Sequence, residues 1–179
     1  MEINFKQLIP GNPGTSFIVA LLYALQQKYK EKITNEDQLS IFSEGIVKSR
    51  NVFFSGIINE IAKNYNHKIT ILSNNTYLLN LADEEINKNQ VDIKFSRLQW
   101  DESIKLIREY KYLIFSVDIY YFRKYHDYHY VCISKQYNNF QIFEPKSGNV
   151  EIINKYQAQK LIQSLTSGLK DVLICFAIQ

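Results

Sequence analysis

The chain has 179 residues, enough to bury the core of one domain spanning residues 1–179. Its 21 basic and 18 acidic residues leave a net charge of +3 and are scattered along the chain, unlike a nucleic-acid-binding surface. The longest apolar run, residues 17–25, is shorter than the roughly 20 residues of a membrane span, and the first residues lack a secretory signal. We therefore expect no membrane span, and a protein that is cytoplasmic or exported without a classical signal peptide.

Helices are predicted in the first part of the chain. The first, over residues 15–30, is apolar on nearly every side through its first half, which is typical of a helix buried in a core. A cap and an acidic first turn at residues 35–37 predict a second helix that ends near residue 48, and the spacing of apolar residues predicts a third over 54–65.

The apolar period changes in the remainder of the chain. Alternation predicts strands over residues 68–72, 91–95, 112–121, 129–135, 140–143, 150–153 and 172–178. Polar loops are expected around residues 74–75 and 87–90, and further helices over 101–110 and 156–165. Helices followed by strands indicate the α+β class: a helical N-terminal half whose buried central helix packs on a C-terminal antiparallel sheet.

A histidine and an acid stand at the ends of two neighbouring predicted strands. His129 opens one strand, Glu144 closes the next, and residues 137–139 between them are turn formers. If the strands pair, both side chains lie at the same edge of the sheet, where the carboxylate can orient the imidazole. His126 and Asp127 compete for the same role. Alternation puts Cys132 on the opposite face from His129.

A nucleophile would complete such a site at the start of the first helix, where Ser16 stands. Unsatisfied backbone N–H groups and the positive end of the helix dipole favour a thiolate there and can receive an oxyanion. Serine is also a common residue at helix starts, so a capping role explains its presence equally well.

These residues, in this order, resemble the papain-like cysteine peptidases, and overall the double-glycine leader peptidase-like proteins that process bacteriocin precursors. The similarity covers an apolar strand at residues 113–117, His129-Tyr130-Val131, and residues 144–148, Glu-Pro-Lys-Ser-Gly, where the family has Asp-Pro-x-x-Gly. Residues 12–17, Asn-Pro-Gly-Thr-Ser-Phe, are similar to a run in ubiquitin-specific proteases that carries cysteine at the position of Ser16.

The resemblance implies a catalytic set of Ser16 as nucleophile, His129 as general base and Glu144 as orienter. It further implies an oxyanion-binding side-chain amide, Gln7 by the first similarity or Asn12 by the second. The implied reaction is hydrolysis of peptide or isopeptide bonds without a metal or organic cofactor. Its partner would be a polypeptide substrate, a peptide ligand or a ubiquitin-like protein. Tyr128 and Tyr130 flank His129 and could line a groove for an extended peptide, although sheet propensity explains these aromatic residues nearly as well.

Serine in place of cysteine leaves three interpretations of position 16. It is an engineered replacement of a cysteine, a natural serine nucleophile, or a helix cap in a protein that has lost catalysis. A site built for a thiolate keeps its architecture but loses most of its rate when it carries serine. Other functions that use the same fold stay open: a catalytically inactive peptide-binding module, a bacterial effector, or an acyltransferase.

Overall fold

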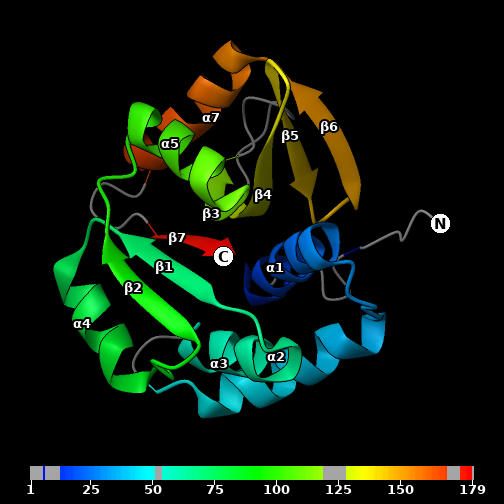
Figure 1. Ribbon diagram of the computed structural model, residues 1–179, viewed down its shortest axis with the longest axis vertical. Coiled ribbons are helices and arrows are strands. Elements are labelled where there is room, and N and C mark those ends of the chain that lie inside the picture. Colours follow the sequence, from blue (N-terminus) through cyan, green and yellow to red (C-terminus); the bar gives the residue numbers. More distant parts are fainter. Residues whose placement is uncertain (1–5, 7–12, 51–53, 119–127, 169–173, 179) are drawn as a thin grey trace.

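A seven-stranded mixed sheet forms the middle of the protein, in the strand order β2-β1-β7-β3-β4-β5-β6 (Figure 1). The structure is a computed structural model that describes residues 6, 13–50, 54–118, 128–168 and 174–178. Its strands are β1 (Ile69–Ser73), β2 (Val91–Phe95), β3 (Tyr112–Asp118), β4 (Tyr128–Gln136), β5 (Asn139–Glu144), β6 (Asn149–Ile153) and β7 (Ile174–Ile178). The described helices are α1 (Pro13–Tyr29), α2 (Asn35–Lys48), α3 (Ser55–Tyr65), α4 (Thr76–Glu85), α5 (Trp100–Tyr110) and α7 (Lys155–Gly168).

The α+β class is confirmed, but the prediction of an antiparallel sheet is wrong. Strands β1 and β2 pair in parallel, with Ile69 opposite Val91, whereas the other neighbouring strands pair antiparallel. A parallel pair needs a crossover between its strands, and α4 supplies it. The sequence pattern does not predict this helix. Its N-cap is Asn75, whose side chain accepts a hydrogen bond from the Leu78 amide at 3.0 Å.

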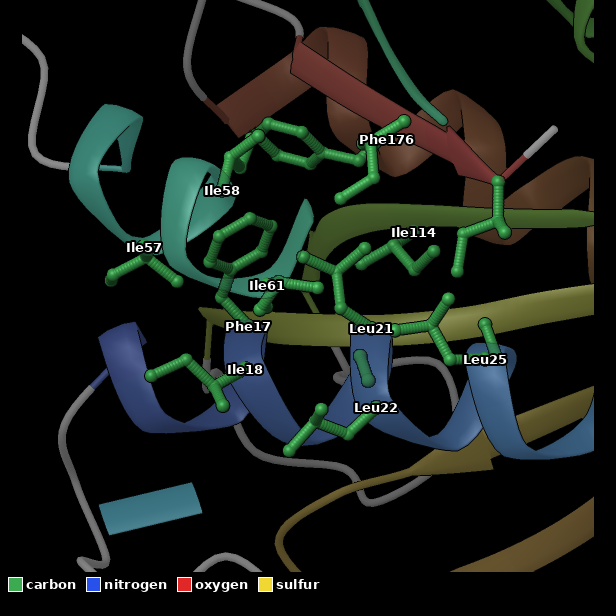
Figure 2. Close-up of a cluster of buried hydrophobic side chains, with 14 of the residues drawn as sticks. Phe17, Ile18, Leu21, Leu22, Leu25, Ile57, Ile58, Ile61, Ile114 and Phe176 are labelled. Carbon is green, nitrogen blue, oxygen red and sulfur yellow. The ribbon is translucent and has the colours of Figure 1, made fainter. Parts of the chain in front are cut away.

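Helix α1 is the buried central helix that the sequence predicts. Its residues 15–25 are all buried, and the apolar ones pack with side chains of α3, β3 and β7 in one cluster (Figure 2). Phe17 lies 4.4 Å from Phe176 between ring centroids, and Tyr23 stacks on Phe143 at 3.9 Å. A second cluster on the other face of the sheet joins α5 and α7 to β3, β4 and β5. The two faces are therefore distinguished by which helices cover them.

Helices α2 and α3 approach so closely that their backbones touch. A Cβ atom on Gly56 would lie 2.1 Å from the Gly45 carbonyl oxygen, and a Cβ on Gly45 would lie 2.6 Å from the Ile57 Cα. The Ser49 hydroxyl bridges the two helices, because it accepts from the Gly56 amide at 3.0 Å and donates to the Gly45 carbonyl at 3.0 Å. This crossing holds the isoleucines of α3 against α1.

Candidate functional site

The candidate site lies where β5 ends and β4 extends beyond the last residue paired with it. Strands β4 and β5 form a hairpin closed by the pair Gln136 and Asn139, with two residues in the turn. In such a hairpin every second residue of β4, counted from Gln136, directs its N–H toward β5, and this series includes Tyr130. The β4–β5 pairing ends at Cys132 and Phe143, so the Tyr130 amide lies beyond the paired part of the hairpin.

Ser16 accepts the hydrogen bond that a residue of β5 would accept if the hairpin were paired this far. The Tyr130 amide donates a hydrogen bond to the Ser16 Oγ over 3.2 Å, and both groups are buried. Ser16 is the fourth residue of α1 and its side chain is 0% exposed. The first turn of the buried helix therefore lies against the backbone of the residue that follows His129.

His129 and Glu144 are in direct contact, as their positions at the sheet edge predict. The His129 Nε2 lies 3.0 Å from the Glu144 Oε1, and the two side chains are 6% and 13% exposed. Alternation puts both on the face of the sheet that carries Val131 and Ile142. Cys132 is buried in the cluster on the α1 face, so its predicted position opposite to His129 is confirmed.

The turn after β5 is shaped to hold the Glu144 carboxylate. Its oxygens accept hydrogen bonds from the Lys146 amide at 2.7 Å and the Ser147 amide at 3.1 Å. The Gly148 amide donates to the Glu144 carbonyl at 2.9 Å, and Gly148 has φ 74°, a conformation that favours glycine. Pro145 fixes φ at the first turn position. The Glu-Pro-Lys-Ser-Gly motif is thus a carboxylate-binding turn.

These contacts keep Glu144 ionised. Burial acts to raise the pKa of the carboxyl group, but hydrogen bonds from His129 and Ser147, the charge of His129 and the Lys146 amide outweigh it and lower the pKa to about 2. A carboxylate only accepts hydrogen bonds, so Nε2 is the ring nitrogen of His129 that is placed to donate to it. Nδ1 is the ring nitrogen that does not face Glu144.

Several predicted site residues lie elsewhere or outside the described residues. Gln7, Asn12, His126 and Asp127 fall outside them. Tyr128 is the first residue of β4. These residues stay predictions.

Tyr130 is described, and its ring is buried. The ring lies 5.0 Å from Phe17 and 6.2 Å from Phe176 between centroids, so it packs the core beneath the site. Its predicted contact with substrate stays a prediction.

The sequence reading missed two kinds of group near the site. The amides of Lys146 and Ser147 that bind Glu144 could have been inferred from an acid placed before a Pro-x-x-Gly turn. Asp118, a buried acid at the end of β3, lies one register pair from His129. The predicted strand ran on past Asp118, so nothing in the pattern marked it as a strand end.

Comparisons with known proteins give no family for the chain. No family model matches the sequence, and a search of curated proteins finds no match. Among the described residues, no three His, Cys, Asp or Glu side chains gather as metal ligands would. In the same part of the chain, no helix has both the length and the apolar character of a membrane span.

Proposed function

We propose that the chain is a papain-like hydrolase of peptide or isopeptide bonds, with Ser16 at the nucleophile position, His129 as general base and Glu144 as orienter. One observation carries the proposal: the 3.0 Å contact of His129 with Glu144 stands next to the hydrogen bond that joins Ser16 to the following residue, Tyr130. Each of the three side chains is buried or nearly so, which strengthens the electrostatic interactions among them.

The reaction is an acyl transfer to water. The Ser16 Oγ attacks the carbonyl carbon of a polypeptide substrate while its proton passes to the His129 Nδ1. Amides at the start of α1 are donors for the oxyanion that forms. The intermediate collapses when the C–N bond breaks and the leaving amine takes the proton from His129. Water then attacks the acyl-enzyme, giving up its proton to His129, and the Ser16 hydroxyl is regenerated.

Glu144 supports this cycle without accepting a proton itself. Its low pKa keeps it anionic at neutral pH, so it stabilises the imidazolium that forms when His129 accepts the proton. Serine is the weaker nucleophile in such a site. A thiol beside histidine at a helix N-terminus ionises readily, whereas a hydroxyl loses its proton only during the attack.

A second candidate function, a peptide-binding module without catalysis, is favoured by one observation. The Ser16 hydroxyl is fully buried and accepts a backbone hydrogen bond from β4. A serine that satisfies a strand amide at this place has a structural role that needs no chemistry. The two candidates differ in whether His129 activates a group at position 16.

Thiol labelling of Ser16→Cys separates the candidates. We expect a peptidyl vinyl sulfone to modify the introduced thiol at neutral pH, at a rate at least about tenfold higher than in Ser16→Cys combined with His129→Ala, because histidine generates the thiolate. Intact mass and peptide mapping would give the rate and the site. The unsubstituted chain is the matched control, because it contains Cys132 and Cys175 but no thiol at position 16.

Two results would count against the hydrolase. Equal labelling rates with and without His129 would mean that the histidine does not activate position 16. A folded Ser16→Cys protein that resists the vinyl sulfone, and also resists the smaller iodoacetamide, would support the peptide-binding module.

A further inference from the structure

The two oxygens of the Glu144 carboxylate have different partners. Oε1 lies 3.0 Å from the His129 Nε2 and accepts a hydrogen bond from the Lys146 amide at 2.7 Å. Oε2 accepts a hydrogen bond from the Ser147 amide at 3.1 Å. The last torsion of a glutamate side chain has a broad energy minimum, so a carboxylate held through one oxygen alone can turn about its terminal bond. The contact at Oε2 therefore fixes the plane in which Oε1 faces the imidazole.

The hydroxyl group of Ser147 makes further contacts with the same glutamate. Its Oγ accepts a hydrogen bond from the Asn149 amide at 3.3 Å, which leaves the hydroxyl proton for another acceptor. The Glu144 carbonyl oxygen lies 3.5 Å from this Oγ, a long distance for a hydrogen bond. The carboxylate is the stronger acceptor because it is charged. Burial acts to raise the pKa of Glu144, and the hydrogen bonds of the His129 and Ser147 side chains act to lower it.

Ser147 is held in place between the ends of β5 and β6. Glu144 and Asn149 are the pair at which these two strands meet the turn. Inside the turn, the Gly148 amide donates to the Glu144 carbonyl at 2.9 Å, and Gly148 has φ 74°. The hydroxyl of Ser147 is therefore next to Glu144 in the folded chain without any rearrangement of the turn.

We propose that Ser147 is a positioning residue of the candidate site, whose hydroxyl holds the Glu144 carboxylate in the orientation that faces His129. The inference rests on the proposed hydrolase function and adds to it a residue that acts through Glu144 and touches no reacting atom. The resemblance does not mark this residue, because position 147 is one of the two open positions of the Asp-Pro-x-x-Gly motif. Alanine at position 147 would keep the amide that binds Oε2 and remove only the hydroxyl.

An NMR titration of the carboxyl groups tests the contact itself. With a pKa of about 2, roughly a tenth of Glu144 is protonated at pH 3. Ser147→Ala should raise this fraction at least about twofold, because the carboxylate loses a hydrogen bond that favours its charged form. Ser147→Thr retains a hydroxyl and should restore it. Ser43→Ala on α2 is the matched control, since the Ser43 hydroxyl donates to the Ser40 carbonyl at 3.1 Å, and it should leave the fraction unchanged.

Thiol labelling at position 16 tests whether the contact affects the chemistry. In the Ser16→Cys background, Ser147→Ala should lower the rate of modification by the peptidyl vinyl sulfone at neutral pH at least about threefold, because Glu144 orients His129 less well. Ser147→Thr should restore the rate. Circular dichroism would show that each variant keeps its fold. A serine that only stabilises the turn would leave the labelling rate of a folded variant unchanged.

The inference and the proposed function fail in different ways. The inference is overturned if Ser147→Ala leaves the protonated fraction of Glu144 at pH 3 unchanged. It is also overturned if Ser16→Cys is labelled with the help of His129, but at the same rate with and without the Ser147 hydroxyl. If Ser16→Cys shows no labelling that depends on His129, the hydrolase proposal is wrong. Ser147 would then stabilise the turn without positioning a catalytic group.

Discussion

Gly56→Ala is expected to destabilise the protein by about 2 kcal/mol, although alanine is the better helix former. The added Cβ would lie 2.1 Å from the Gly45 carbonyl oxygen and 2.8 Å from the Ser49 amide nitrogen. Both obstacles belong to the backbone of α2 and its C-cap, so no side-chain rotation relieves the clash. Overpacking of this kind costs up to about 3 kcal/mol, which exceeds the gain of about 1 kcal/mol from helix propensity.

The measurement is urea unfolding followed by circular dichroism. Ser40→Ala, on an exposed position of α2, controls for the effect of adding an alanine to the same helix pair. Gly45→Ala should be comparably harmful, because its Cβ would meet the Cα of Ile57 at 2.6 Å. Unchanged unfolding midpoints for both glycine variants would mean that α2 and α3 do not approach as closely as the structure has them.

Local sequence patterns predicted most of the helices and strands because each carries its own signal. Strand β2 occupies the residues expected of it, and α2 ends at Lys48 as predicted, although its N-cap is Thr34 rather than a residue of 35–37. Helix α4 was missed because its ten residues lie among asparagine-rich loops, and its buried side chains are only Leu79 and Ala82. The parallel pairing of β1 with β2 depends on that missed crossover, so it was lost with the helix.

The contact between His129 and Glu144 was accessible from the sequence because a tight hairpin fixes the register of its two strands. Counting from the turn brings the histidine and the acid to the same edge and the same face. The position of Ser16 was accessible only through the resemblance. Its contact with Tyr130 depends on how α1 packs across the sheet, which no local pattern encodes. The amides that hold Glu144 were not predicted, although an acid placed before a Pro-x-x-Gly turn is a pattern that indicates them.

The pH dependence of stability should report directly on Glu144. Its folded-state pKa of about 2 lies below its ordinary value of 4.5, so the folded protein binds the proton less readily than the unfolded chain. The carboxylate therefore stabilises the fold fully above about pH 4.5, and this contribution is lost as the pH falls through 2. A shift of this size corresponds to about 3 kcal/mol, and the side chain is only 13% exposed, so solvent screening reduces it little.

Glu144→Gln removes the titrating group with little change in shape, and the comparison of unfolding free energies between pH 3 and pH 6 tests the linkage. We expect the wild-type protein to lose about 2 kcal/mol of this contribution by pH 3, whereas the variant lacks this loss. The difference between the two proteins should therefore shrink as the pH falls. Glu84→Gln, on the exposed surface of α4, controls for the loss of a carboxylate and should follow the wild-type curve. If the unfolding free energies of the wild-type protein and Glu144→Gln change in parallel with pH, the turn and His129 do not hold Glu144 in its ionised form. The orienting role proposed for Glu144 would then have no electrostatic basis.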